Sequence, residues 1–376
     1  MRFTISKKEL AKALKTVGMA IPRKSPREIL ECVKLTAGEG WLRVTGTDLE
    51  LTVEQAVTAD VEVETPGELL VNAALLSSVL SQCTADSLTI ELADAEKHTV
   101  KVTYDGAEYE LNGDDPEEYP GKASGQWEAF CDVDAGVLSG LLSRVSFAAA
   151  KDSIRFAINS VLLQRAGGVL CAVATDGHRL AVDKSGLVMH ADDPGAKLML
   201  PAKAVACIER MLGDAASDDK VSVQTAEKDN VFRVRCGSTV ITSRVIEGSF
   251  PAWEDIVPKD NDKAAVIGVG DFLTAVRQAA VMASEESFCV KMTFGESGVA
   301  LVAGYGGRGK AAVRRDLVSY NGDECFVGLK PGYVQDVLGV LCKGDDVEIR
   351  LKDKDRPVLI VSGDYRYVLM PVSVED

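Results

Sequence analysis

Several kinds of residue are scarce in this chain. Its 376 residues include only three histidines, His98, His178 and His190, and 6% aromatic side chains. The nine cysteines are scattered without a Cys-x-x-Cys pair, and several lie in apolar runs, as Cys171 does. This pattern argues against a disulfide framework or a zinc site. It predicts reduced, buried thiols in a cytosolic protein that holds no metal.

Long apolar runs and an excess of positive charge are missing too. No run of about 18 uncharged apolar residues occurs and the first residues do not resemble a signal peptide, so we expect neither a membrane span nor secretion. The 42 Lys and Arg against 57 Asp and Glu leave a net charge of −15. A protein that grips nucleic acid by neutralising phosphates needs the opposite balance, so this mode of binding is excluded.

The chain does contain a threefold internal repeat. An apolar segment, a polar break and a run of alternating apolar residues recur in the same order, with Val71, Leu200 and Val327 as matching positions. These positions lie 129 and 127 residues apart. The sequence Thr47–Leu51 returns as Thr175–Leu180, 128 residues later. A period this long exceeds that of solenoid repeats, which span roughly 20–50 residues, and therefore indicates three similar domains in tandem.

Each repeat combines helix and strand signals. In the first, Ser6 and Glu9 form a capping-box pattern ahead of an apolar stripe at helical spacing. Asp134 and Asp271 precede the corresponding stripes. Period-2 alternation predicts the strands that follow, as in Leu88–Leu92. The interpretation is an α+β chain with domains at 1–126, 127–258 and 259–376, and polar junctions near 114–128 and 257–264.

Catalytic signals are weak. His178 lies beside Asp176, which suggests an acid–base dyad, but no nucleophile is near and the first repeat has Glu50 in place of His178. The Gly-x-Gly-x-x-Gly string at 304–309 follows a strand pattern late in the chain, where a turn between strands suits it better than a dinucleotide site. The chain is therefore predicted to be a non-enzyme without a cofactor.

Positive charge is concentrated on the predicted helices and beside them, whereas Asp and Glu are frequent in strands and linkers. Because the pattern recurs in three similar units, it predicts a common basic helical surface. Its members are Lys7, Lys8, Lys12, Lys15, Arg23, Lys24, Arg27, Arg144, Lys151, Arg155, Lys203, Arg210, Arg277 and Lys330.

Four segments carry a family resemblance: 154–160, VATDGHRLAV at 173–182, 248–258 and the closing YVLMPV at 367–372. With the length and the triplication, they resemble the bacterial sliding clamp, the beta subunit of the DNA polymerase III holoenzyme. The resemblance implies the DNA-clamp fold: a head-to-tail homodimer forms a closed ring, helices line a central hole and antiparallel sheets lie outside. It also implies a cytoplasmic processivity factor that a clamp loader places around double-stranded DNA and that tethers polymerase subunits.

The resemblance further implies a pocket between the second and third domains that takes the short clamp-binding motif of partner proteins. The pocket residues carried over to this chain are Ile158, Thr175, Gly177, His178, Arg179, Leu180, Pro251, Ile256, Val368, Met370, Pro371 and Val372. In this interpretation His178 is a wall of the pocket. The alternative, an enzyme built on the Asp176–His178 dyad, remains open here.

The same resemblance assigns the DNA-facing and joining residues. The duplex-facing positions are Lys24, Arg155, Phe156 and Lys203, to which the helix position Lys12 is added from the charge pattern. The ring joint pairs Val281 and Met282 of the third domain with Tyr109 and Leu111 of the first. A third hypothesis is a clamp-fold adaptor that forms no ring.

The chain departs from the family's pattern at three places. One is Glu108 near the ring joint, which departs from the usual ionic pattern of that interface. Glu375 and Asp376 add acidic charge beside the pocket, where the family often ends in a basic residue. The segment 304–316 is basic and glycine-rich where relatives are commonly acidic, and its role stays open.

Overall fold

The computed structural model describes residues 1–121, 125–151, 153–154, 156–185, 195–283, 289–304 and 309–374. The same order of elements occurs three times: a strand leads into a helix, further strands follow, and a later strand leads into a second helix and three final strands. The described chain falls into two compact units, residues 1–138 with 206–245 and residues 139–205 with 246–376. They are called here the first and the second unit.

The first repeat lies wholly in the first unit. Its elements are β1 (Arg2–Ser6), α1 (Lys7–Val17), the 3-10 turn η1 (Glu28–Glu31), β2 (Cys32–Gly38), β3 (Trp41–Thr47), β4 (Leu51–Val57), β5 (Val61–Thr65), β6 (Gly67–Asn72), α2 (Ala73–Gln82), β7 (Ser87–Asp94), β8 (Thr99–Tyr104) and β9 (Ala107–Asp114). The predicted stripe on α1 is confirmed, because Leu10, Leu14 and Val17 are buried. The capping box is wrong: Ser6 precedes α1 but its side chain makes no capping hydrogen bond.

The second repeat contributes to both units. Its elements are β10 (Glu128–Asp134), α3 (Ala135–Val145), η2 (Ser146–Ala148), η3 (Phe156–Asn159), β11 (Ser160–Ala166), β12 (Val169–Thr175), β13 (Arg179–Ser185), β14 (Lys197–Pro201), α4 (Ala202–Gly213), β15 (Lys220–Ala226), η4 (Glu227–Asp229), β16 (Val231–Cys236) and β17 (Thr239–Arg244). Strands of this repeat therefore extend the sheets of the first and of the third repeat.

The third repeat lies in the second unit. The short helix α5 (Trp253–Ile256) precedes it. Its elements are β18 (Lys263–Gly268), α6 (Val269–Ala280), β19 (Val290–Gly295), β20 (Gly298–Ala303), β21 (Ala311–Arg315), β22 (Ser319–Asn321), β23 (Cys325–Leu329), α7 (Pro331–Val340), β24 (Asp346–Leu351), β25 (Val358–Ser362) and β26 (Tyr365–Leu369). Asp271 lies in the first turn of α6, directly before the predicted stripe, of which Phe272, Leu273 and Val276 are buried. The glycine-rich segment joins the antiparallel strands β20 and β21, as predicted for a turn, although its residues 305–308 lie outside the described part.

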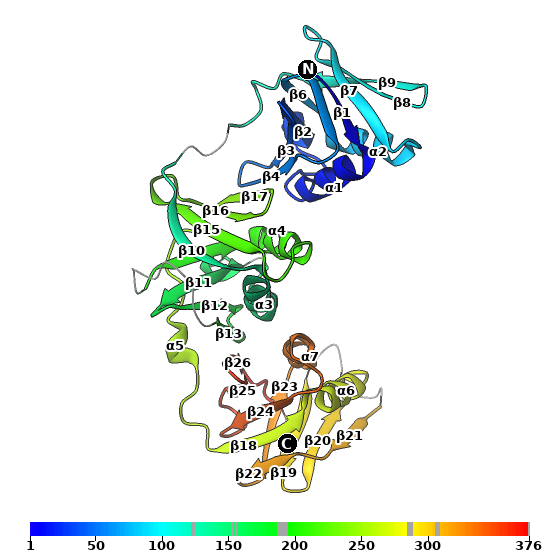
Figure 1. Cartoon of the computed structure of the whole chain (residues 1–376). Helices are drawn as coiled ribbons and strands as arrows, with labels where there is room; N and C mark the ends of the chain where they lie inside the picture. The colour runs from blue at the N-terminus through cyan, green and yellow to red at the C-terminus, as the bar shows by residue number, and fades with distance from the viewer. Residues whose placement is uncertain are drawn as a thin grey trace. The chain divides into compact units, whose positions relative to one another are not determined.

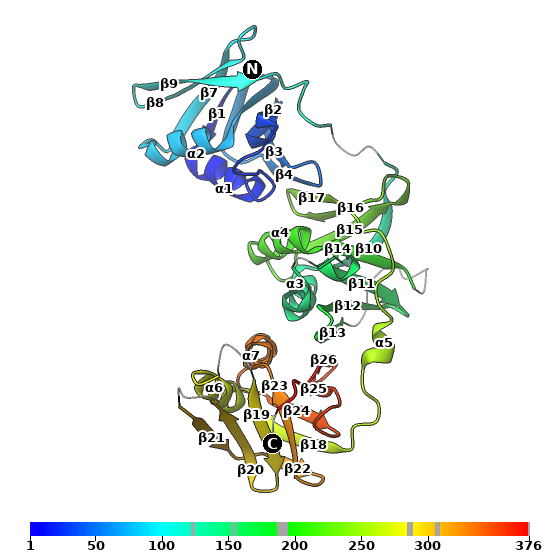
Figure 2. The same ribbon diagram turned by 180° about the vertical axis from the view of Figure 1, so that it is seen from behind.

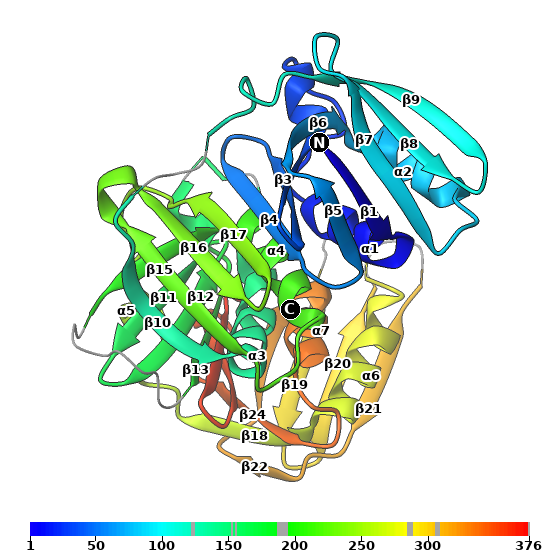
Figure 3. The same cartoon turned by 45° about the horizontal axis from the view of Figure 1, so that its top comes forward.

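Antiparallel sheets carry the fold. In the first unit thirteen strands follow the order β10-β15-β16-β17-β4-β3-β2-β6-β9-β8-β7-β1-β5, and Figure 3 shows β9, β8, β7 and β1 side by side. In the second unit nine strands follow the order β14-β11-β12-β13-β26-β25-β24-β18-β22, beside a four-stranded sheet β21-β20-β19-β23. Helices pack in pairs on the strands, α1 with α2 and α6 with α7 (Figures 1 and 2).

The cysteines follow the prediction with one exception. Eight of the nine are buried and none forms a disulfide, but Cys342, two residues after the end of α7, is exposed. Burial raises the pKa of the Cys171 thiol to about 12, which suppresses the reactive thiolate. These buried cysteines serve as apolar core residues.

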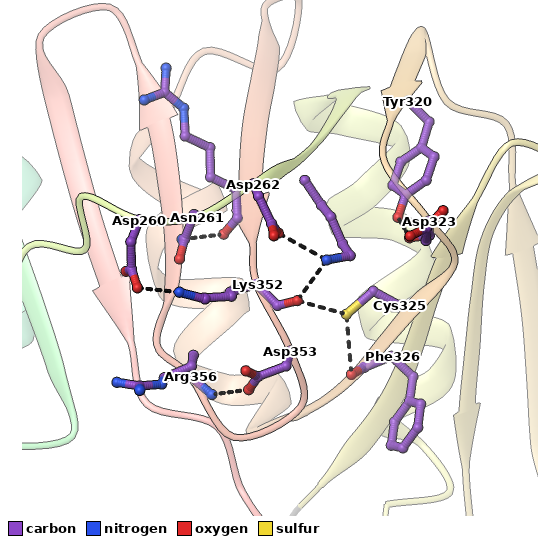
Figure 4. A network of polar contacts seen from close by, with 12 residues as sticks. Asp260, Asn261, Asp262, Tyr320, Asp323, Cys325, Phe326, Lys352, Asp353 and Arg356 are labelled. Atoms are coloured by element: carbon purple, nitrogen blue, oxygen red, sulfur yellow. Dashed lines mark hydrogen bonds and ion pairs between the residues drawn. The ribbon is translucent and has the colours of Figure 1, made fainter.

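The segment that leads into β18 is held by a polar network (Figure 4). Asn261 donates to the carbonyl oxygens of Arg350, at 2.9 Å, and Pro357, at 3.4 Å. Lys352 pairs with Asp260, and Lys263 donates to Asp262 and to the Lys352 carbonyl oxygen at 2.8 and 2.9 Å. The network holds the residues just before β18 against β24 and the segment that leads into β25.

Candidate functional site

The site begins at a tight turn between β12 and β13, residues Thr175–Arg179. The Thr175 hydroxyl donates to the carbonyl oxygen of Arg179 at 2.6 Å and accepts from the N–H of Gly177 at 3.1 Å. One carboxylate oxygen of Asp176 accepts from the N–H groups of His178 and Arg179, at 2.9 and 3.0 Å. Gly177 has φ 89°, a conformation that suits glycine. Threonine and aspartate thus fix the turn, and His178 is exposed on it.

Strand pairing brings the last strand of the chain to this turn. β13 pairs with β26 so that Leu180 lies opposite Val368, and the N–H of Met370 donates to the His178 carbonyl oxygen at 2.9 Å. The residues after β26 continue along the fold, because the N–H of Val372 donates to the carbonyl oxygen of Gly328 at 2.8 Å. Parts of the second and third repeats, far apart in sequence, therefore meet at one place.

A buried apolar cluster lies beneath the turn. Its members are Leu162, Cys171, Val173, Leu180, Val182, Met199, Trp253, Leu359, Val361 and Val368, with Ala157, Ile246, Phe250 and Val257 packed against it. Of the predicted pocket residues, Ile158 and Thr175 are buried as well, and Pro251, Pro371 and Val372 are half-buried. Ile256 and Met370 stay 39% and 43% exposed. The site thus offers accessible apolar side chains around a preformed apolar base.

Arg179 is engaged inside the fold. Its guanidinium group donates to Asp176 at 2.9 Å, to Asp336 of α7 at 2.6 Å and to the Phe147 carbonyl oxygen at 2.6 Å. It also lies 4.3 Å from the ring centroid of Tyr333. Burial lowers the pKa of Arg179, but the hydrogen bond to Asp336 and the other neighbours raise it above the ordinary value overall. This network was not predicted from the sequence, because the residues that contact Arg179 follow no regular spacing along the chain.

The arrangement does not favour a catalytic dyad. One oxygen of Asp176 accepts the two backbone N–H groups of the turn, and the other accepts from Arg179 Nε. The carboxylate therefore braces the turn and the arginine, which leaves it poorly placed to activate the His178 imidazole as a general base.

The predicted duplex-facing residues are found in both units. Lys12 is exposed on α1, where Lys8 and Lys15 line with Arg210 of α4 a cavity of about 370 Å³ in the first unit. Lys24 is exposed after α1, and Lys203 is exposed at the start of α4. Arg155 and the side chain of Phe156 lie outside the described residues.

The residues predicted for the ring joint differ in exposure. Val281 and Met282 follow α6 and are 77% and 40% exposed. Tyr109 on β9 is half-buried and its ring stacks on Tyr104, with 5.8 Å between centroids. Leu111 is 5% exposed and belongs to the core of its own repeat, so Tyr109 offers more surface at this edge than Leu111 does.

Three successive α+β domains with one element order, joined by antiparallel strand pairing, define a protein of the DNA-clamp class. Models of the N-terminal, central and C-terminal domains of the DNA polymerase III beta subunit match residues 1–123, 132–252 and 254–373. The chain belongs to the DNA polymerase III beta subunit family. As a member of this family it is a processivity factor of DNA replication and not an enzyme.

Relatives match over the full length. The chain is 28% identical to the beta sliding clamps of Pseudomonas putida and Escherichia coli, with 99% of this chain and 100% of each relative covered. The solved DNA polymerase III subunit beta of Pseudomonas aeruginosa has 26% identity and a TM-score of 0.91, with both chains fully covered. The C. crescentus clamp, also at 26% and 0.91 with full coverage, is described with PEG bound to a putative beta-motif tethering region.

Proposed function

We propose that this chain encircles duplex DNA as a head-to-tail homodimer and holds its partners through a short peptide motif bound at the Thr175–Arg179 turn. The observation that carries the peptide site is the meeting of β13 and β26 over one apolar cluster, with Ile256 and Met370 still accessible. The partners proposed are polymerase subunits, the clamp loader and other proteins with the motif.

The site suits a short apolar segment. Apolar anchors in a preformed site give most of the affinity of such complexes, and a few polar groups fix the orientation of the peptide. The cluster supplies the apolar base, and the ordered turn supplies backbone groups and His178 at its rim. Arg179 holds α7 against the turn and acts as a positioning residue for this site.

Replacing Met370 with lysine is expected to weaken a Gln-Leu-Ser-Leu-Phe peptide at least about tenfold, because a charge replaces an apolar contact at the site. Fluorescence anisotropy with the labelled peptide measures the change. Val318→Lys introduces the same charge at a 65% exposed valine outside the site and should leave the affinity unchanged. Equal affinities of the wild-type protein and the Met370 variant would contradict the peptide site.

The basic helix surface supports the DNA part of the proposal. Lys8, Lys12 and Lys15 of α1 lie with Arg210 of α4 around one cavity, although the chain carries a net charge of −15. A ring that holds DNA by enclosure needs little affinity, and tight binding to phosphates would impede sliding. Among the described residues no helix is long and apolar enough to cross a membrane. Replication function places the proposed site of action in the cytoplasm.

Enclosure predicts a dependence on the topology of the DNA. After loading by a clamp loader, the protein should remain on nicked circular DNA at least about ten times longer than on linear DNA of the same length, because only linear DNA has ends. Raising the salt concentration should shorten the retention on circles only slightly, in contrast to a protein held by phosphate contacts. Gel filtration of the loaded complexes measures both, and equal loss from circles and linear DNA would contradict enclosure.

A further inference from the structure

The first unit contains a second turn of the same design. The Thr47 hydroxyl donates to the Leu51 carbonyl oxygen at 3.0 Å and accepts from the N–H of Leu49 at 3.1 Å. One Asp48 oxygen accepts from the N–H groups of Glu50 and Leu51, at 3.0 and 2.7 Å. These four bonds repeat those of the Thr175–Arg179 turn one for one. The internal repeat thus places a second copy of the turn at the junction of the first and second repeats.

The strand junction is repeated as well. β17 pairs with β4 as β26 pairs with β13, and the N–H of Arg244 donates to the Glu50 carbonyl oxygen at 3.1 Å. The corresponding bond at the other junction joins Met370 to His178. Arg244 therefore occupies the position that corresponds to Met370. The junction in the first unit thus has a positively charged side chain where the proposed peptide site at the Thr175–Arg179 turn has an apolar one.

A cleft of about 630 Å³ lies at this junction. We call it the junction cleft. The strands β3, β4, β16 and β17 supply most of its lining, and the turns between them, Asp229 and the connecting segment with Pro120, Gly121 and Trp127 supply the rest. Leu49 lines the cleft with φ 82° and stays 46% exposed. A bulky residue at positive φ is strained, and such strain is concentrated at binding sites.

The side chains that line the junction cleft carry one more positive than negative charge. Four arginines, Arg43, Arg233, Arg235 and Arg244, line it against the carboxylates of Glu50, Glu54 and Asp229. Glu54 already pairs with Arg43 at 3.8 Å. Arg233 lies 4.3 Å from the ring centroid of Trp127, and burial and the charge of Arg235 lower the pKa of Arg233. Because the positive charges of Arg233 and Arg235 repel each other, binding of an anion beside them would stabilise both charged side chains.

We propose that the junction cleft is a second docking site, which binds an extended peptide carrying carboxylates on either side of an apolar residue. Arg235 and Arg244, both exposed, would pair with the carboxylates, because guanidinium groups bind carboxylates in a bidentate manner. Leu49 and Trp127 would contact the apolar residue. The charge of the cleft selects a ligand unlike the uncharged motif of the first site, so one protomer holds two different partner segments.

The test uses a random 12-residue peptide library displayed on phage and panned on the full-length protein, with the double variant Arg235→Glu/Arg244→Glu as the counter-target. The expected result is a set of acidic peptides with a central apolar residue. Measured by fluorescence anisotropy as labelled synthetic peptides, they should bind the double variant at least about tenfold more weakly than the wild-type protein. Circular dichroism melting establishes that the variant is folded.

Two matched controls separate this site from the first. Arg356→Glu makes the same change at an exposed arginine of the third repeat that does not line the cleft, and should not weaken the selected peptides. Met370→Lys should weaken the Gln-Leu-Ser-Leu-Phe peptide but not the acidic ones, so failure of either site is recognised independently. A library that gives only peptides indifferent to the double variant, or basic ones, overturns the proposal.

Discussion

Replacing Arg179 with alanine is expected to lower the free energy of unfolding by about 3 kcal/mol, because it breaks a largely buried network of charges. The Arg179 side chain is only 10% exposed, and Asp176, which it pairs with, is 15% exposed. Without the guanidinium group, Asp176 and the Phe147 carbonyl oxygen lose a donor, and Tyr333 loses the cation over its ring. The contribution of Asp336 is smaller, since that carboxylate is 46% exposed and water replaces its partner.

The Arg179 prediction has two controls. Arg366→Ala removes an arginine whose hydrogen bonds go to the backbone oxygens of Gly363 and Tyr365 in its own hairpin, and should cost less than about 1 kcal/mol. The loss in the free energy of unfolding for Asp336→Asn should lie between those for Arg366→Ala and Arg179→Ala. Chemical denaturation followed by circular dichroism gives the three values. A loss for Arg179→Ala no larger than that for Arg366→Ala would show that the network does not hold the junction.

The variant Asp336→Asn also distinguishes a positioning role of Arg179 from a direct contact between Arg179 and the peptide. If Arg179 acts by holding α7 against the turn, Asp336→Asn should weaken the Gln-Leu-Ser-Leu-Phe peptide in the same direction as Arg179→Ala, though Asp336 is not among the proposed pocket residues. A peptide affinity that falls in Arg179→Ala and stays unchanged in Asp336→Asn assigns Arg179 a direct contact instead.

The parts of the site that were predictable from sequence are those that repeat. Thr175 and Asp176 recur as Thr47 and Asp48, and both pairs make the same turn, because its hydrogen bonds join residues two to four apart. Arg179 has Leu51 as its counterpart, so the repeat gave no signal for its network. Its partner Asp336 is 157 residues away, a relation that only the tertiary fold creates.

Local patterns also failed where tertiary packing decides. Ser6 and Glu9 have the spacing of a capping box, yet Ser6 is the last residue of β1 and its side chain does not cap the helix. Cys342 belongs to an apolar stretch of sequence but is exposed after α7. In both cases the neighbouring elements of the fold determine the environment of the residue, and the local sequence pattern does not show those neighbours.

Replacing Met282 with aspartate is expected to convert the dimer into monomers, with a dissociation constant raised at least about a hundredfold. Val281 and Met282 form an exposed apolar patch at the end of α6, beside Gly309 near the start of β21. Within the described residues, β21 is the edge of its sheet, and β9 pairs over residues 107–112 only with β8. Burying a carboxylate costs several kcal/mol, and a closed head-to-tail dimer contains this interface twice. Sedimentation equilibrium measures the constant, and an unchanged dimer would favour either another interface or an adaptor without a ring.

The charges of the two edges predict which strands meet. Glu108 and Glu110 are exposed on β9, and Lys310 and Arg314 are exposed at β21. Opposite charges stabilise strand pairing and like charges oppose it, so Arg314→Glu and Glu110→Lys should each weaken the dimer about tenfold per interface. In a head-to-tail dimer the double variant again places opposite charges at both interfaces, and its affinity should recover toward that of the wild-type protein. Independent, additive losses would instead place Glu110 and Arg314 at separate surfaces, because residues without contact do not compensate one another.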